Sequence, residues 1–283
     1  MSYTVASGVR EVNGTRLPYD LYLPAGRTSA LAGILLLHGF GADRHSLAGH
    51  AQRLAGAGVA AVLTPDMSSL MAGGVDVARS RNIAQAADQA LWLATLPQLA
   101  GGPGVALAGH SAGGAVAFEA AALLAIQGAT PRGVCLLDGV PWERTAAAAA
   151  SWPASTVPLL SLRGSPDSWN MQGKMRDVLA ALPAPGATVA FLPRSRHGDA
   201  LDPKGNTLML RLLGLLGAPG SSELIAALLD AYMRDVLSSA PGGFEDGPLA
   251  QLAKEHPDEL KVEHRRNAAA APKRDDAAAL ASV

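Results

Sequence analysis

The pentapeptide Gly109-His110-Ser111-Ala112-Gly113 constrains the fold of this chain more than any other feature. A short apolar run, residues 104–108, precedes it, and an alanine-rich segment of helical character, residues 114–126, follows it. A G-x-S-x-G sequence also arises by chance among 31 glycines, but a strand, a sharp turn and a helix in this order indicate a nucleophile elbow. We therefore predict that Ser111 is a nucleophile; the alternative is a serine that caps the following helix.

A nucleophilic serine needs a base that accepts its proton. Three of the seven histidines follow Ser111 in the chain, namely His197, His256 and His264. The last two lie in a charged C-terminal stretch and are expected to be solvated. His197 directly follows a strand-like run, residues 187–192, and a loop after the last strand is the expected place for the base. The sequence thus predicts that His197 is the base.

Two aspartates compete for the acid that orients this histidine. Asp138 ends the apolar run 133–138, and Asp167 lies just beyond the run 157–163. Because the acid usually follows the next-to-last strand, we predict Asp167, and we interpret Asp138 as a residue that caps a loop or binds backbone amides. Asp199 is too close in sequence to His197 to reach its ring and is interpreted as a turn residue.

The attacked carbonyl becomes an oxyanion, which needs two backbone N–H donors. The residue after the nucleophile, Ala112, is predicted to supply one of them. The other is predicted to come from Phe40, in the loop His38-Gly39-Phe40-Gly41 that follows the apolar run 31–37. His38 is interpreted as a structural histidine of this loop.

Strand-like and helix-like segments alternate along the chain, which indicates a mostly parallel sheet flanked by helices. A hairpin with its turn at Asn13-Gly14 is predicted at the N-terminus. The predicted strands are 3–12, 15–23, 31–37, 59–64, 104–108, 133–138, 157–163 and 187–192, which makes an eight-stranded sheet, and the predicted helices are 44–56, 78–96, 112–127, 171–182 and 222–238. The connection 139–156 is too short for a large cap domain. We expect a catalytic domain over 1–240, an extension over 241–264 and a disordered tail over 265–283.

Residues from about 3 to 238 resemble the α/β-hydrolase superfamily. The landmarks occur in the order of that family: residues 19–24, the loop 38–41, Thr64-Pro65-Asp66, Gly109 to Gly114, Asp167 and His197. The resemblance implies a serine hydrolase that cleaves carboxylic esters through an acyl-enzyme, with a thioester or an amide as alternative substrate. The rival interpretation from another class is a non-catalytic protein of this fold that binds a small apolar ligand.

A finer resemblance concerns the residues around the substrate. Val140-Pro141-Trp142 resembles the polyester hydrolase and cutinase-like branch, and the loop 38–40 with the strand end at Asp138 resembles chlorophyllases. This resemblance implies that Phe40 and Trp142 clamp the substrate. His110 and Trp169 complete the predicted substrate-binding set, although His110 stands where polyester hydrolases often carry an aromatic such as tryptophan.

Composition favours a compact enzyme and excludes several other classes. A net charge of −1 gives no electrostatic basis for binding nucleic acid, and no apolar run reaches the length of a membrane span. The sequence shows no metal-ligand spacing and no phosphate-binding lysine, so we predict no metal and no cofactor. The N-terminus lacks the pattern of a secretion signal, which predicts a cytoplasmic protein unless a signal has been removed. The single cysteine, Cys135, is expected in the core, and the oligomeric state cannot be predicted.

Overall fold

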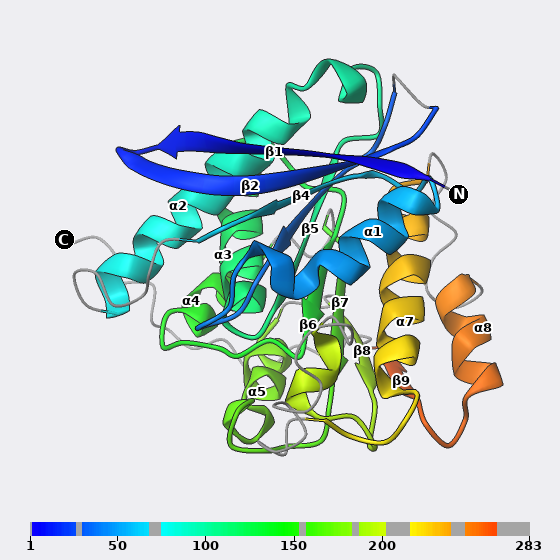
Figure 1. The fold of residues 1–283 in the computed structure, drawn as a ribbon. Helices are drawn as coiled ribbons and strands as arrows, with labels where there is room; N and C mark the ends of the chain where they lie inside the picture. The colour runs from blue at the N-terminus through cyan, green and yellow to red at the C-terminus, as the bar shows by residue number, and fades with distance from the viewer. Residues whose placement is uncertain are drawn as a thin grey trace.

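The computed structural model describes residues 2–26, 30–67, 75–152, 157–182, 187–201, 216–238 and 247–264. Within these residues one sheet of nine strands has the order β1-β2-β4-β3-β5-β6-β7-β8-β9 (Figure 1). The strands are β1 (Tyr3–Val12), β2 (Thr15–Pro24), β3 (Gly33–Leu37), β4 (Ala61–Pro65), β5 (Val105–His110), β6 (Val134–Leu137), β7 (Leu159–Arg163), β8 (Thr188–Phe191) and β9 (Lys261–His264). Strands β3 to β8 run parallel, as the alternation of strands and helices predicts.

Helices cover both faces of this sheet, because successive side chains of a buried strand point to opposite faces. Leu35 and Leu37 of β3 pack with α2 (Val75–Ala94) and α3 (Ala112–Ile126). Ile34 and Leu36 of the same strand pack with α1 (Ala48–Gly56) and α7 (Ser221–Val236). The sheet is thus apolar on both faces, which explains why its parallel strands read as continuous apolar runs. Cys135 lies in β6 and is fully buried, as expected.

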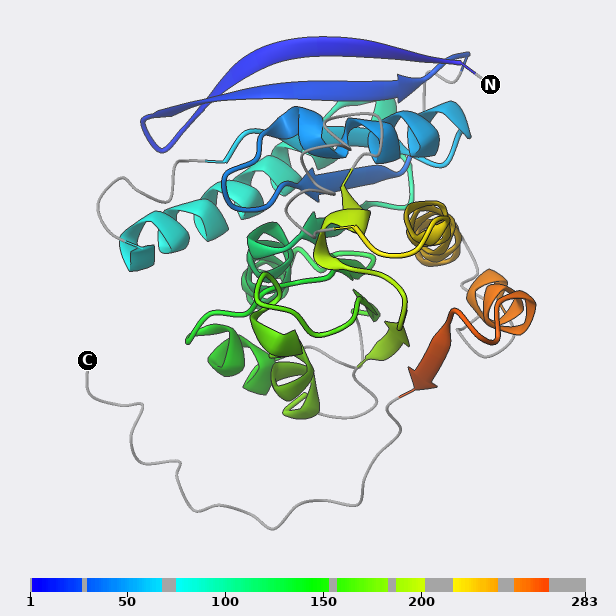
Figure 2. The ribbon, with the colours of Figure 1, turned by 60° about the horizontal axis from the view of Figure 1, so that its bottom comes forward.

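The two edges of the sheet differ from its parallel centre. Strands β1 and β2 form an antiparallel hairpin with Asn13 and Gly14 both at positive φ, the conformation that a tight two-residue turn requires. At the opposite edge β9 pairs antiparallel with β8 (Figure 2). Parallel strands end together at one edge of a sheet, and this is where the site residues after β3, β5, β6, β7 and β8 meet.

The α/β-hydrolase fold class predicted from the sequence is confirmed, but the prediction of eight strands is wrong. The ninth strand, β9, has the sequence Lys-Val-Glu-His, in which only Val262 is apolar, so its pattern does not indicate a strand. Helix α8 (Pro248–Glu255) precedes it and buries Leu249, and Leu260 is buried as well. Within the predicted extension, residues 247–264 thus pack on the sheet and on α7, while the division into a catalytic domain and an extension stays a prediction. The predicted tail, 265–283, lies outside the described residues.

The connection after β6 contains one short helix within its described residues, α4 (Thr145–Ala150). After β7 the chain forms a turn, the short 3-10 helix η3 (Met171–Gly173) and helix α5 (Met175–Ala180). Helices α4 and α5 lie against each other, so these two connections together cover one side of the strand ends. No described helix is long and apolar enough to cross a membrane.

Candidate active site

Ser111 lies in a sharp turn between β5 and α3. Its backbone has φ 56° and ψ −124°, a conformation that residues other than glycine rarely adopt. The turn is held because the N–H of Ser111 donates to the carbonyl of Leu137, and the carbonyl of Ser111 accepts the N–H groups of Gly114 and Val140. A side chain at Gly113 would come within 2.5 Å of the carbonyl oxygens of Leu37 and His38, so the helix can approach β3 only with glycine there. This is the strand, turn and helix that the pentapeptide predicts.

The loop after β3 lies directly beside Ser111. A Cβ atom added at Gly39 would be 2.9 Å from the Cβ of Ser111, so glycine permits this close approach. The side chain of Phe40 is 64% exposed at the mouth of the site. His38 fixes the loop because its Nδ1 donates to the carbonyl of Gly39 (2.9 Å) while its Nε2 accepts the N–H of Met67 (3.0 Å). Burial lowers the pKa of His38, which keeps it in the neutral form that these bonds require.

The first turn of α3 supplies the other expected oxyanion donor. The helix begins at Ala112, and the first N–H groups of a helix have no carbonyl acceptor within it. Ala112, Phe40 and Ser111 all line the same cavity. The two N–H groups are therefore near the serine, and their role as oxyanion donors stays a prediction.

His197 is hydrogen-bonded to Asp138. The distance from Nδ1 of His197 to Oδ2 of Asp138 is 2.7 Å, and both side chains are more than 90% buried. The ring nitrogen donates, which leaves Nε2 of His197 as the atom available to a hydroxyl. Asp138 directly follows β6 and has a positive φ of 46°, and its Oδ1 accepts the N–H of Gly164 (3.2 Å). The geometry thus brings together a carboxylate and the predicted base.

The prediction that Asp167 is the partner of His197 is wrong. Oδ1 of Asp167 accepts the backbone N–H groups of Trp169 and Asn170 (both 2.9 Å), so this carboxylate stabilises a turn in its own loop. Asp167 lies four residues beyond the end of β7, and by then the chain has turned. Asp138 lies directly at the end of the neighbouring strand and faces the histidine. Both aspartates follow adjacent strands, so the sequence pattern alone could not separate them.

The loop that carries His197 is held by Asp199, predicted as a turn residue, and by Gly217 and His50, to which the sequence pattern gives no role in this loop. The 3-10 helix η4 (His197–Ala200) is capped by Asp199, whose Oδ2 accepts the N–H of Arg196 (2.8 Å). Both carboxylate oxygens of Asp199 also accept the N–H of Gly217, and burial raises the pKa of this aspartate. Nε2 of His50, on α1, lies 2.9 Å from the carbonyl of Ala200 and joins the loop to that helix.

His110 is buried beside the histidine loop. Its Nε2 donates to the carbonyl oxygen of His197 (3.0 Å), and the two rings are in contact with their centres 4.6 Å apart. Burial, together with the nearby His197, lowers the pKa of His110 to about 3. A neutral, 4% exposed ring bonded to the backbone supports the loop of His197. The predicted contact of His110 with substrate stays a prediction, because the ring also borders the cavity.

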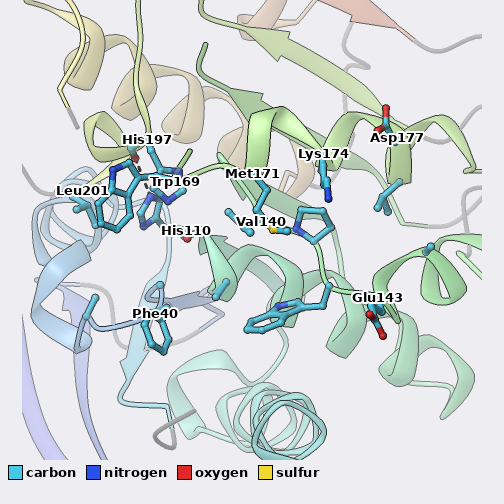
Figure 3. A pocket seen from close by; sticks show the side chains of 18 residues that line it. Phe40, His110, Val140, Glu143, Trp169, Met171, Lys174, Asp177, His197 and Leu201 are labelled. Carbon is cyan, nitrogen blue, oxygen red and sulfur yellow. Dashed lines mark hydrogen bonds between the residues drawn. The ribbon is translucent and has the colours of Figure 1, made fainter. Parts of the chain in front are cut away.

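A cavity of about 810 Å³ lies next to these residues. Figure 3 shows His197, His110 and Trp169 in one part of it, Val140 and Met171 in the middle, and the charged residues Glu143, Lys174 and Asp177 in another part. The wall as a whole is predominantly apolar, and more than half of its lining residues come from the connections after β6 and β7. Such a lining suits a substrate that is largely apolar.

The two predicted tryptophans both line this cavity, in different settings. Trp169 is 52% exposed at its edge. Trp142 is half-buried, its backbone N–H donates to Oγ1 of Thr145 (2.9 Å), and the guanidinium of Arg79 lies over its ring at 5.3 Å. Arg79 is itself buried and paired with Glu119. The structure thus gives Trp142 a fixed place in the wall, while binding of substrate by either tryptophan stays a prediction.

Comparisons with known proteins agree with this architecture. A family model described as a thioesterase domain matches residues 47–190, about half of the chain. The dienelactone hydrolase of Anabaena variabilis is 22% identical over 84% of this chain and 100% of that chain, with a TM-score of 0.63. A thermostable carboxylesterase from a metagenomic library is 16% identical over 84% and 90%, with a TM-score of 0.61. An esterase from Pyrobaculum calidifontis is 14% identical over 83% and 86%, with a TM-score of 0.62.

At these identities the solved structures show a shared fold, the α/β-hydrolase fold. No curated protein sequence gave a significant match. The finer resemblance to polyester hydrolases and chlorophyllases stays a prediction. The family match covers α1, the elbow at Ser111, Asp138, strands β4 to β7 and most of β8. The chain belongs to the thioesterase domain family and is an ester hydrolase of α/β-hydrolase fold.

Proposed function

We propose that this protein is a serine hydrolase that cleaves carboxylic esters through an acyl-enzyme, with Ser111, His197 and Asp138 as its triad. The observation that carries the proposal is the 2.7 Å hydrogen bond between His197 and Asp138 beside a serine in a nucleophile elbow. A serine hydroxyl is a weak nucleophile, and a histidine whose other nitrogen is held by a carboxylate is the usual means to activate it.

The chemistry follows from the roles of these groups. Nε2 of His197 accepts the proton of the Ser111 hydroxyl as its oxygen attacks the acyl carbon, and Asp138 stabilises the imidazolium that forms. The N–H groups of Ala112 and Phe40 hold the oxyanion. His197 then gives the proton to the leaving alcohol, which departs and leaves the acyl group on Ser111. A water molecule, with His197 again as base, releases the acid and restores the serine.

A thioester substrate is the second candidate, and the thioesterase family match favours it. An oxyester and a thioester pass through the same kind of tetrahedral intermediate and differ in the leaving group. Paired substrates with one acyl group, as an alcohol ester and as a thiol ester, separate the candidates. If the specificity constant for the thiol ester exceeds that of its oxyester partner well beyond the ratio of their uncatalysed rates, the protein is a thioesterase.

The experiment that tests the proposal uses a fluorophosphonate, which reacts with activated serines. We expect the wild-type protein to gain the mass of one phosphonyl group on Ser111 and the Ser111→Ala variant to remain unlabelled. Ester hydrolysis by that variant should fall by roughly 10³-fold or more. A folded Ser111→Ala protein that hydrolyses esters at a near-normal rate, or an unlabelled wild-type protein without activity, would refute the proposal. The second result would favour a non-catalytic ligand-binding protein.

A further inference from the structure

The side chain of Asn170 is fully engaged in the turn after β7. It is 1% exposed, and its Nδ2 donates to Oδ2 of Asp138 (3.2 Å) and to the carbonyl of Ser165 (2.9 Å). Its Oδ1 accepts the N–H groups of Asp167 (2.9 Å) and Gly173 (3.0 Å). A primary amide has two donor hydrogens and an acceptor oxygen with two lone pairs, so all of its hydrogen-bonding capacity is used here. The amide can therefore adopt only one orientation.

The oxygen of Asp138 that Asn170 contacts is the oxygen that holds His197. Oδ2 accepts both Nδ2 of Asn170 and Nδ1 of His197, while Oδ1 accepts the N–H of Gly164. Without Asn170 the carboxylate would keep only one donor on each oxygen and would be held less firmly. We propose that Asn170 is a positioning residue that fixes the carboxylate of Asp138 toward His197. This inference rests on the proposed function.

Asp167 supports this arrangement one step further from the site. Its Oδ1 accepts the N–H of Asn170, and its own N–H donates back to Oδ1 of Asn170. This reciprocal pair fixes the backbone from which the Asn170 side chain extends. The same oxygen of Asp167 accepts the N–H of Trp169, at the edge of the cavity. Hydrogen bonds in this turn therefore connect Trp169 in the cavity wall, through Asp167 and Asn170, to the carboxylate of Asp138.

The amide of Asn170 carries no net charge, and this neutrality matters as well as its shape. Asn170 places a neutral donor on Oδ2 of Asp138, while His197 bonds the same oxygen and His110 interacts electrostatically with this carboxylate. Asp167 bonds the backbone of Asn170. Replacing Asn170 with aspartate keeps both acceptor contacts but removes both donors and adds a second carboxylate next to Asp138. Like charges at this distance favour a proton on the neighbouring histidine.

The test compares Asn170→Asp, Asn170→Ala and a control, Ser165→Ala, in the full-length protein. Oγ of Ser165 donates to the carbonyl of Pro193, so the control loosens the same loop without touching Asp138. We expect both Asn170 variants to lose about ten- to hundredfold in kcat with little change in KM, the loss typical of a hydrogen bond to a charged group. In Asn170→Asp the acid limb of the kcat/KM profile should also move to higher pH.

The outcomes separate this inference from the proposed function. If the wild-type protein is labelled by the fluorophosphonate and Asn170→Asp has a normal kcat and an unmoved acid limb, the positioning role is overturned and the triad stands. An equal loss in Ser165→Ala would also overturn it, because any loosening of the loop would then suffice. If Asn170→Ala does not fold, Asn170→Asp decides alone, since it has nearly the same shape as the native residue.

Discussion

Two non-glycine residues of the candidate triad have positive φ angles, Ser111 with 56° and Asp138 with 46°. Such backbone conformations cost of order 1–3 kcal/mol each and persist only where the surrounding structure enforces them. Around Ser111 three backbone hydrogen bonds do so. For Asp138 the N–H is bound by the carbonyl of Leu162 and the carboxylate by the turn after β7. These backbone conformations place the side chains of both residues at the strand ends, where His197 lies.

The first residue-scale prediction separates the two aspartates. Asp138→Asn should lower kcat on the order of 10⁴-fold, because an amide beside Nδ1 of His197 no longer enforces the tautomer with a free Nε2. Asp167→Asn retains an acceptor oxygen for the N–H groups of Trp169 and Asn170, so its kcat should fall far less. Steady-state kinetics with circular dichroism as the folding control measure both. If kcat falls more in a folded Asp167→Asn protein than in Asp138→Asn, the acid is Asp167, as the sequence pattern predicts.

A second residue-scale prediction concerns His110 and pH. Its pKa is about 3 in the folded protein, below the ordinary value of about 6.5 that applies when the chain is unfolded. Between these values the unfolded state binds a proton that the folded state does not, so stability decreases as the pH falls below 6.5. At 1.36 kcal/mol per pH unit, His110 should cost about 2 kcal/mol at pH 5.

The matched variant is His110→Gln, whose amide nitrogen can still donate to the carbonyl of His197 but cannot be protonated. Urea unfolding at pH 7 and pH 5 should show a smaller loss of stability in this variant than in the wild type. The buried His38, whose pKa is also lowered, should leave part of the pH dependence in both proteins. An equal loss of stability between pH 7 and pH 5 in the two proteins would contradict the neutral state of His110.

At the scale of elements, the parallel centre of the sheet was predictable and its surroundings were not. Buried strands are continuous apolar runs, α7 has an apolar stripe at helical spacing, and α3 is an alanine-rich segment directly after the elbow, so their places along the chain follow from local sequence. Helix α4 has only six residues and no apolar periodicity, so its sequence does not show how it packs, and β9 is short and charged. The choice between Asp138 and Asp167 depends on the turn after β7, whose path is set by side-chain bonds of Asn170. No local pattern encodes that path.

The C-terminal elements offer an element-scale prediction. A chain that ends after residue 246 loses α8 and β9, and with them the buried Leu249 and Leu260. Burial of two leucines contributes about 3 kcal/mol or more, so this truncation should lower the free energy of unfolding by at least that amount. A chain that ends after residue 264 retains these elements and serves as the control. Identical urea midpoints for the two chains would show that these elements contribute nothing to stability.

On the scale of the whole molecule, the connections after β6 and β7 together form more than half of the wall of the cavity. Trp142→Ala should lower kcat/KM for bulky aromatic esters by up to about tenfold, the geometric contribution of an aromatic contact of 0.5–1.5 kcal/mol. Small acetyl esters should be almost unaffected. Because Arg79 packs on this ring, a melting curve is the necessary control. An equal loss for both esters with a lower melting temperature would assign Trp142 to packing alone.

The burial of Cys135 has a practical consequence for labelling this protein in solution. It is the only cysteine of the chain, it is fully buried in β6, and burial raises the pKa of its thiol, so alkylating reagents should not modify it in the folded state. A cysteine introduced at an exposed position would then be the single reactive thiol. Met171 is 40% exposed and lines the cavity, so a fluorophore attached to Met171→Cys would report the arrival of a substrate by its emission, without any background mutation.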